Sequence, residues 1–368
     1  MRIGHVSIAG THKSGLCETV HSLVKAEREL GADAEIVLPD GHACNDPRGI
    51  PVRPYSERNN YDVIISHSGI ALDALDRGQP IVYMCHGGPY YVFLKDGAGE
   101  TTNFYSAKSR WCLHPQYAAF VTFYPKHLAY WRLFVPEDRL HLINPPLDMD
   151  YWCDGSSDYR FGGKQGEINV VCATTWRECH TMFHLVNAFA EFAREHAGAK
   201  LHIYGIGRFW NKISIAWQIL LRQLHEKGWL GETKQWTHDM RAIYRAADMS
   251  IVPVDNAPNT VRQSLACGCP LVAEHGNEHT SWTAPQTNIT AFADAMDDCW
   301  HSTCQDREAI RSMCVAYARE AFDPTRAAAG LLRIIKNVYE QSSSDGDRAE
   351  LQPALDARRM PEERACPR

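Results

Sequence analysis

Two polar side chains eight residues apart, Asp255 and Gln263, stand where the sequence favours a strand, a turn and a helix in succession. The apolar run 249–254 predicts a short strand, and the helix that follows is expected to end at Gly268. Free backbone N–H groups and the helix dipole at such a helix start form an anion site. The carboxyl end of a parallel strand is also where α/β sheets bind ligands. The same spacing fits an ordinary βαβ unit in which Thr260 and Gln263 form a capping box.

Two more apolar runs, 62–67 and 81–86, end in a histidine. A doubly wound sheet places such polar strand ends at its ligand cleft, so His86 is a candidate catalytic residue, with a purely structural role as the alternative. Gly15 lies in the turn between the first strand and the first helix, where a glycine lets the backbone approach a ligand. A tight βα turn would explain Gly15 equally well.

The segment 104–134 contains no Asp or Glu and interleaves basic residues with aromatic ones. Part of it, 118–123, predicts a buried strand, whereas 124–132 predicts a basic, aromatic surface that includes Lys126 and Arg132. Such a surface suits a membrane interface, a lipid phosphate, or the bases and phosphates of nucleic acid. Simple packing of the aromatic side chains is the alternative interpretation.

The elements that must position these residues alternate between strands and helices along the chain, which is typical of α/β folds. Strands are predicted at 3–9, 34–38, 62–67, 81–86, 118–123, 168–173, 201–207, 249–254 and 270–273, and helices at 16–30, 182–196, 208–222, 308–322 and 325–339. The expected organisation is a first domain at 1–150, a linker at 151–166, a second domain at 167–324, a terminal helix at 325–341 and a polar tail at 342–368.

Composition frames these expectations. The chain has 368 residues, of which 45% are hydrophobic and 22% charged, and these are the values of a globular protein long enough for two domains. No apolar stretch is long enough to span a membrane, and the first residues lack the layout of a signal peptide. The 13 scattered cysteines favour reduced thiols and a cytoplasmic location, and the net charge of −6 gives no global attraction to nucleic acid or anionic lipid.

Several motifs in order resemble the retaining GT-B glycosyltransferases of group 1, the family of sucrose synthases and bacterial cell-surface glycosyltransferases. The letters YRAAD, SIVPVD and QSLACGCPLVA, which span residues 244–273, fall into register with its donor-site segment. The resemblance implies that two family glutamates are replaced here by Asp255 and Gln263. In the family the first contacts the donor sugar and the second holds the nucleotide ribose. Thr260 and Val261, at the start of the same helix, are counted with the donor-binding residues.

The resemblance extends to both halves of the chain. Gly15 matches one glycine of the family's loop near the sugar diphosphate, and His86 matches a histidine, followed by glycine, that contacts the donor sugar. Family members carry an arginine and a lysine that bind the diphosphate. Here Arg177 and His180 are the cationic candidates, and cations favour departure of the phosphate leaving group.

The resemblance implies an α/β protein of GT-B fold, with two Rossmann-like domains facing across a cleft. It implies a retaining glycosyltransferase that needs no metal and no cofactor beyond its nucleotide-diphosphate sugar, for which a UDP-sugar is the expectation. The expected acceptor is a glycan or glycolipid hydroxyl, and the expected location is cytoplasmic, with peripheral membrane contact as an option. The alternatives are transfer to hydroxymethylated bases in DNA and a catalytically silent nucleotide-sugar-binding protein.

Overall fold

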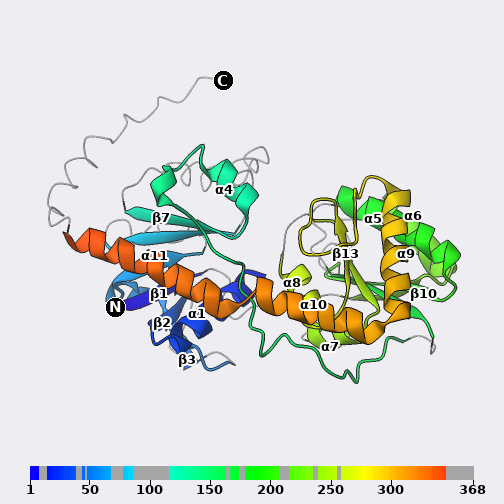
Figure 1. Ribbon diagram of the computed structural model, residues 1–368, viewed down its shortest axis with the longest axis horizontal. Helices are drawn as coiled ribbons and strands as arrows, with labels where there is room; N and C mark the ends of the chain where they lie inside the picture. Colours follow the sequence, from blue (N-terminus) through cyan, green and yellow to red (C-terminus); the bar gives the residue numbers. More distant parts are fainter. Residues whose placement is uncertain are drawn as a thin grey trace. The chain divides into compact units, whose positions relative to one another are not determined.

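The computed structural model describes residues 1–7, 15–38, 44–45, 48–67, 78–86, 116–162, 166–173, 179–206, 215–234, 239–254 and 258–344. The chain forms two compact units (Figure 1). Unit 1 comprises Met1–Gly10, Val24–Ile143 and Ala328–Arg368, and unit 2 comprises Thr11–Leu23 and Asn144–Ala327.

Unit 1 is built on an eight-stranded sheet with the strand order β3-β4-β2-β1-β5-β6-β7-β8. The strands are β1 (Arg2–Val6), β2 (Asp33–Leu38), β3 (Cys44–Asn45), β4 (Pro51–Pro54), β5 (Val63–Ser66), β6 (Ile81–Cys85), β7 (Tyr117–Thr122) and β8 (Leu140–Leu142). All neighbouring pairs are parallel except β3 with β4. Strands β2, β3 and β4 lie on one side of β1, and the chain then crosses to the other side of β1, where β5 to β8 follow in order. The topological switch point therefore lies between β1 and β5.

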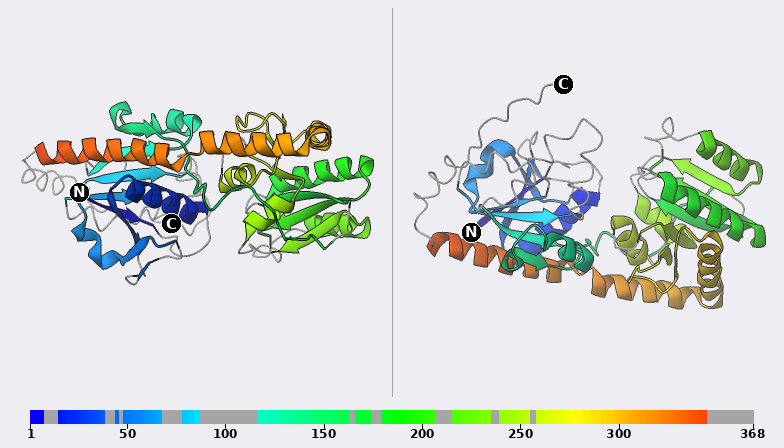
Figure 2. Two further views of the ribbon diagram at one scale, coloured as in Figure 1. Left: turned by 60° about the horizontal axis from the view of Figure 1, so that its bottom comes forward. Right: turned by 90° about the horizontal axis from the view of Figure 1, so that it is seen from above.

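The helices of unit 1 flank this sheet (Figure 2). They are α1 (Gly15–Glu29), which is divided between the two units, η1 (Tyr55–Asn60), α4 (Pro125–Trp131), η4 (Glu137–Arg139) and most of α11 (Pro324–Ser344). Helix α1 ends as the sequence predicts, because Gly31 adopts a positive φ of 87° just beyond it.

Unit 2 is built on a six-stranded, wholly parallel sheet with the strand order β11-β10-β9-β12-β13-β14. The strands are β9 (Ile168–Ala173), β10 (Ala199–Tyr204), β11 (Leu230–Lys234), β12 (Met249–Val252), β13 (Leu271–Glu274) and β14 (Thr283–Ala284). The helices are α5 (Cys179–Glu195), α6 (Ile215–Glu226), α7 (Met240–Ala246), α8 (Asn259–Ala266), α9 (Ile289–Gln305) and α10 (Arg307–Ala321). The switch point of this sheet lies between β9 and β12.

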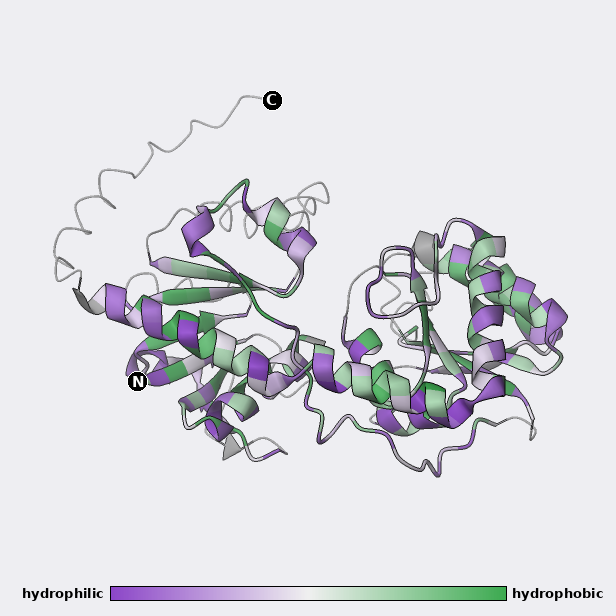
Figure 3. Cartoon of the chain, in the orientation of Figure 1, coloured by the Kyte–Doolittle hydropathy of each residue, from purple (hydrophilic) through white to green (hydrophobic). Residues whose placement is uncertain are grey.

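The core of unit 2 consists of apolar side chains from the central strands and from the helices that cover them. Val170 of β9, Phe189 of α5, Ile251 of β12 and Phe292 of α9 belong to one buried cluster. Figure 3 shows the same division by hydropathy: β13 of unit 2 is green, and α11, most of which belongs to unit 1, alternates between purple and green along its length. This is the pattern of parallel strands buried on both faces under amphipathic helices.

Residues 143–162, between the last strand of the first sheet and the first strand of the second, contain no helix or strand. They are nevertheless bonded to helices and strands of unit 2. Ser157 Oγ donates to the carbonyl of Ala242 at 2.6 Å, and Arg245 Nε donates to the carbonyl of Cys153 at 2.8 Å. Phe161 is buried, and its ring centroid lies 4.0 Å from that of His202. The segment predicted as a linker is thus fixed along α7 and β10.

Several sequence-based boundaries were wrong. The strand predicted at 249–254 ends at Val252, and the helix predicted at 208–222 is described from Ile215 and continues to Glu226. Helix α9 and the short strands β3, β4, β8, β11 and β14 were not predicted at all. The tail beyond Ser344 lies outside the described residues.

Candidate active site

The donor-side candidates of unit 2 lie on α8, directly after β12 at the switch point. Val261 is fully buried, Gln263 is 8% exposed and Thr260 is half-buried. The hydroxyls of Ser250 and Ser264 lie 2.6 Å apart and join β12 to α8. A helix start is thus fixed at the carboxyl edge of the sheet. The N–H groups of Val261 and Arg262 both donate to the carbonyl of the N-cap residue, Pro258, at 3.0 and 3.2 Å.

The capping-box interpretation of this helix was wrong. Pro258 is the N-cap residue and makes no side-chain cap hydrogen bond, whereas Thr260 is already the second residue of the helix. Within the described part of the chain, the Gln263 amide makes no hydrogen bond. Since capping does not occupy it, this amide can take a polar ligand such as a ribose hydroxyl.

Sequence reasoning missed a buried arginine beside the same helix start. Arg262 is 4% exposed, and its guanidinium donates to the carbonyl of Pro146, to Asn259 Oδ1 and to Thr19 Oγ1. Its bond to Asn259 braces the first turn of α8. The signal was a charged residue directly before Gln263, in a short helix predicted to lie between two buried strands.

Two of the three predicted catalytic residues lie outside the described residues. Asp255 follows β12 in the sequence, and Arg177 follows β9, so both come after the strands that flank the switch point. His180 is the second residue of α5, and its side chain is not described. The roles of all three stay predictions.

In unit 1, His86 directly follows β6, at the strand end where the sequence placed it, and its side chain is half-buried. Its catalytic role stays a prediction. Its Nε2 lies 2.8 Å from Nδ1 of His67, which follows β5. The His86 ring also contacts Phe123, with 5.5 Å between the centroids. Since β5 borders the switch point, His67 and His86 stand where this fold binds ligands.

The His67 contact continues into the interior. His67 Nε2 lies 2.9 Å from Nδ1 of His5 on β1, and Nε2 of His5 lies 2.7 Å from Oε2 of Glu27 on α1. Sequence reasoning missed His5, His67 and Glu27, because nothing in their spacing indicates that they meet. Gly15, predicted to lie in the turn before the first helix, is the first residue of α1, and its role near a ligand stays a prediction.

The acceptor-side candidates lie on and after α4. Lys126 is exposed, and exposed Arg132 forms an ion pair of 3.0 Å with Glu137. His127 and Trp131 of the same helix are buried. The predicted basic, aromatic surface is therefore partly core, and residues 104–115 of that segment lie outside the described residues.

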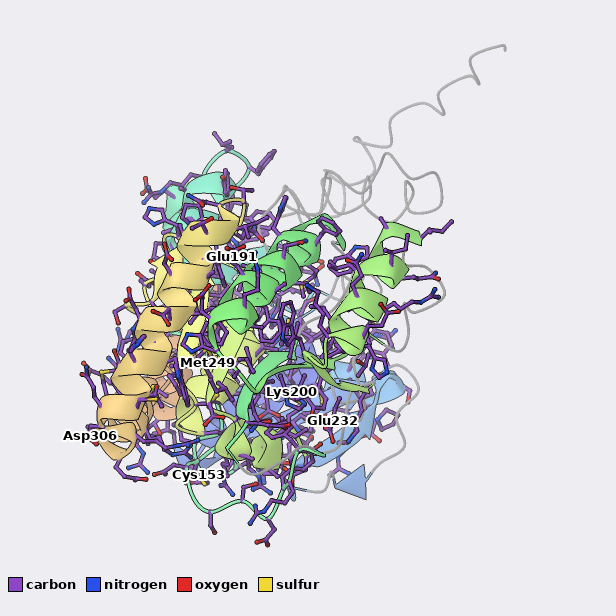
Figure 4. The ribbon with its side chains drawn as sticks, turned by 90° about the vertical axis from the view of Figure 1, so that its right-hand side faces the viewer. Cys153, Glu191, Lys200, Glu232, Met249 and Asp306 are labelled. Atoms are coloured by element: carbon purple, nitrogen blue, oxygen red, sulfur yellow. The ribbon has the colours of Figure 1, made fainter. Side chains whose placement is uncertain are left out.

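A cavity of about 940 Å³ lies in unit 2, but it is not the candidate site. It is lined by residues that precede β9 and β12, including Glu167 and Arg245, and by residues of α10, including Arg307, which is paired with Asp248 at 2.6 Å. Met249, at the start of β12, is labelled in Figure 4 and marks the amino end of that strand. The cavity therefore opens at the amino edge of the sheet, opposite the strand ends that carry the site.

The comparison with protein families decides what kind of domain unit 2 is. Residues 167–302 match the family described as "Glycosyl transferases group 1". This match spans the sheet of unit 2 and includes the β12–α8 segment. The chain carries a group 1 glycosyl transferase domain.

The two units together resemble solved structures across nearly the whole chain. A sucrose-phosphate synthase from Thermosynechococcus elongatus has a TM-score of 0.71 at 14% identity, with 93% of this chain and 100% of that chain covered. The Anabaena protein HepE, in complex with UDP and glucose, has a TM-score of 0.68 at 14% identity and covers 92% and 100%. An α,α-trehalose 6-phosphate synthase from Burkholderia multivorans has a TM-score of 0.67 at 10% identity and covers 93% and 99%.

These likenesses establish the GT-B fold, with two Rossmann-like domains, that the sequence motifs predicted. No curated protein sequence matches this chain. In the described part of the chain, no helix is long and apolar enough to cross a membrane. The matched residues 167–302 include α8 of unit 2, whereas His86 and the residues bonded to it belong to unit 1.

Proposed function

We propose that this chain is a retaining, metal-independent glycosyltransferase that moves a sugar from a nucleotide-diphosphate donor to an acceptor hydroxyl. The observation that carries the proposal is the family match over 167–302, within which α8 begins at the switch point of the sheet. The HepE structures in complex with UDP and with UDP-glucose support a uridine nucleotide as the donor.

The donor side follows from hydrogen-bonding capacity. The N–H of Thr260, in the first turn of α8, suits an anion. The N–H of Val261 donates to the carbonyl of Pro258 at 3.0 Å, so Val261 is assigned to the donor site only by its position in this turn. The amide of Gln263, which makes no hydrogen bond to any residue that the structure describes, suits a ribose hydroxyl, which it can bond without a charge. Asp255, after β12, is assigned to the hydroxyls of the donor sugar.

Charge governs the chemical step. As the glycosidic bond breaks, negative charge grows on the departing diphosphate and positive charge grows on the sugar. Arg177 and His180 are assigned to the diphosphate, and His86 to the sugar. The acceptor hydroxyl attacks from the face that the diphosphate leaves, and the leaving phosphate takes its proton. The sugar then keeps its anomeric configuration.

The acceptor proposed is a glycan or glycolipid. Lys126 and Arg132 lie beside the exposed apolar side chains Tyr130, Leu133 and Phe134, of which Leu133 is 78% exposed. Basic residues next to exposed aromatic and aliphatic ones suit the interface of an anionic membrane, where a lipid-linked acceptor resides. Unit 1 supplies this surface.

A panel of nucleotide sugars tests the proposal, with release of free nucleotide as the readout. We expect release from at least one donor, accelerated by an acceptor extract and unaffected by a metal chelator. Mass spectrometry of glycans, lipids and DNA from cells that express the chain then identifies the acceptor. Nucleotide-sugar binding without release from any donor would contradict the proposal and indicate a silent binding protein. Detection of a glycosylated DNA base would show that the acceptor is DNA and not a glycan.

A further inference from the structure

An unbroken chain of hydrogen bonds runs from a buried carboxylate to His86 in unit 1. Its links are Glu27 Oε2 to His5 Nε2 at 2.7 Å, His5 Nδ1 to His67 Nε2 at 2.9 Å, and His67 Nδ1 to His86 Nε2 at 2.8 Å. Glu27 and His5 are fully buried, and His67 is 3% exposed. Four separate elements supply these groups: α1, β1 and the residues that follow β5 and β6.

The middle of this chain is neutral. Burial, followed by the neighbouring rings of His86 and His5, holds the pKa of His67 well below its ordinary value of 6.5. A neutral imidazole has one N–H donor and one acceptor nitrogen, so it passes the direction of hydrogen bonding from one side to the other. The hydrogen-bonding direction set at Glu27 therefore determines which ring nitrogen of His86 carries the proton.

Glu27, at the buried end of the chain, sets the direction in which each hydrogen bond is donated. With Glu27 ionised, its carboxylate only accepts hydrogen bonds, so His5 donates to it through Nε2 and keeps Nδ1 as an acceptor. His67 then donates through Nε2 to His5, and His86 donates through Nε2 to His67. Each ring is the Nε2–H tautomer, and His86 keeps Nδ1 as an unprotonated acceptor.

We propose that Glu27, His5 and His67 are positioning residues that fix His86 in the Nε2–H tautomer and strengthen its Nδ1 as an acceptor toward the donor sugar. This inference rests on the proposed function in assigning the sugar to His86. The chemical benefit lies in the transition state, where positive charge grows on the sugar ring. Hydrogen bonds in series polarise one another, so the Glu27 charge makes Nδ1 of His86 more negative than that of an isolated ring.

The cost of the arrangement argues against a purely structural role. Among the described residues, Oε1 of Glu27 has no hydrogen-bond partner, and a buried carboxylate so poorly paired costs stability. Glu35 of the same unit offers a direct contrast. It is also buried, yet its carboxylate accepts from Arg2, Arg53 and Tyr61, which makes it a satisfied structural anchor.

Nitrogen NMR of the full chain with labelled histidine tests the tautomers without any reference to activity. The inference predicts protonated Nε2 and unprotonated Nδ1 in His5, His67 and His86 of the unmodified protein. The Glu27→Gln variant loses the fixed acceptor, and its amide can donate to His5, so the Nδ1–H tautomer of His86 should become populated. An Nδ1–H tautomer of His86 in the unmodified protein would overturn the inference, even if the variant does not fold.

Kinetics supply the second readout, with Glu35→Gln as the matched control. Because the charge benefit arises in the transition state, Glu27→Gln should lower kcat about 5- to 100-fold, with KM changed less than about 3-fold. Glu35→Gln should leave kcat within about 2-fold of the unmodified protein. Equal losses in both variants, or an unchanged kcat in Glu27→Gln, would overturn the inference. A protein with the expected tautomers that transfers no sugar would instead refute the proposed function.

Discussion

Acid should destabilise unit 2 through one buried histidine of β10, His202. Its Nδ1 accepts from the backbone N–H of Glu232 at 3.0 Å, and its Nε2 lies 3.0 Å from Asn169 Oδ1, so both ring nitrogens are bonded in the neutral form. Burial lowers the pKa of His202 from 6.5 to about 4; the charges of Lys200 and Lys234 add to this and that of Glu232 opposes it. Lys200 and Glu232 come from the adjacent strands β10 and β11 (Figure 4).

The sign follows from proton binding. Between pH 6.5 and about 4 the unfolded chain binds a proton at this position and the folded chain does not, so stability is retained above pH 6.5 and lost as pH falls through this window. The difference between 6.5 and about 4, at about 1.4 kcal/mol per pKa unit, amounts to about 3 kcal/mol at most.

Urea unfolding followed by circular dichroism between pH 7 and pH 4 measures this loss. His202→Gln keeps an acceptor and a donor but cannot be protonated, so it should remove about 3 kcal/mol of the pH dependence. His225→Gln, at an exposed position of α6, should keep the full pH dependence. Parallel pH profiles for the unmodified protein and His202→Gln would refute the reasoning.

Four further changes test the candidate site. Asp255→Ala should lower turnover far more than it lowers stability, and an unchanged rate in a folded variant would remove Asp255 from the site. Gln263→Glu should keep activity or strengthen nucleotide binding; unfolding of the domain would identify the amide as structural. Arg177→Ala should weaken nucleotide-sugar binding by about 1.5–3 kcal/mol and leave nucleoside binding unchanged, whereas equal losses for both ligands would make the arginine structural. Replacing Lys126 and Arg132 with Gln should weaken binding to anionic vesicles. If DNA is the acceptor, the plot of log DNA affinity against log salt concentration should instead become shallower, by the equivalent of about two phosphate contacts. If neither vesicle binding nor DNA binding changes, Lys126 and Arg132 do not form an acceptor surface.

The fold was predictable where burial left a strong pattern. Strand β6, IVYMC, is a short apolar run between polar residues, as a strand buried on both faces requires. The edge strands escaped notice because they carry no such pattern: β11 reads LGETK and is half-buried or exposed throughout. Helix α9 could have been found, since Asn288 caps it by accepting from the N–H of Ala291, and Phe292, Met296 and Cys299 recur at helical spacing.

The candidate site was predictable only in part, because some of its residues are marked by their local sequence and others are brought together only by the fold. His86 could be singled out from its position at a strand end. His5, Glu27 and His67 could not, since they come from three different elements that meet only in the folded sheet. The capping box failed for a local reason, because Pro258 takes the N-cap position and places Thr260 inside the helix.

The anomeric configuration of the product tests the central claim most directly. The donor identified by nucleotide release is incubated with the chain, its acceptor and a metal chelator, and proton NMR follows the anomeric signal of the first product formed. The proposed function predicts transfer in the presence of the chelator, with the anomeric configuration of the donor retained. An inverted product, or transfer only after a divalent metal is restored, would contradict it.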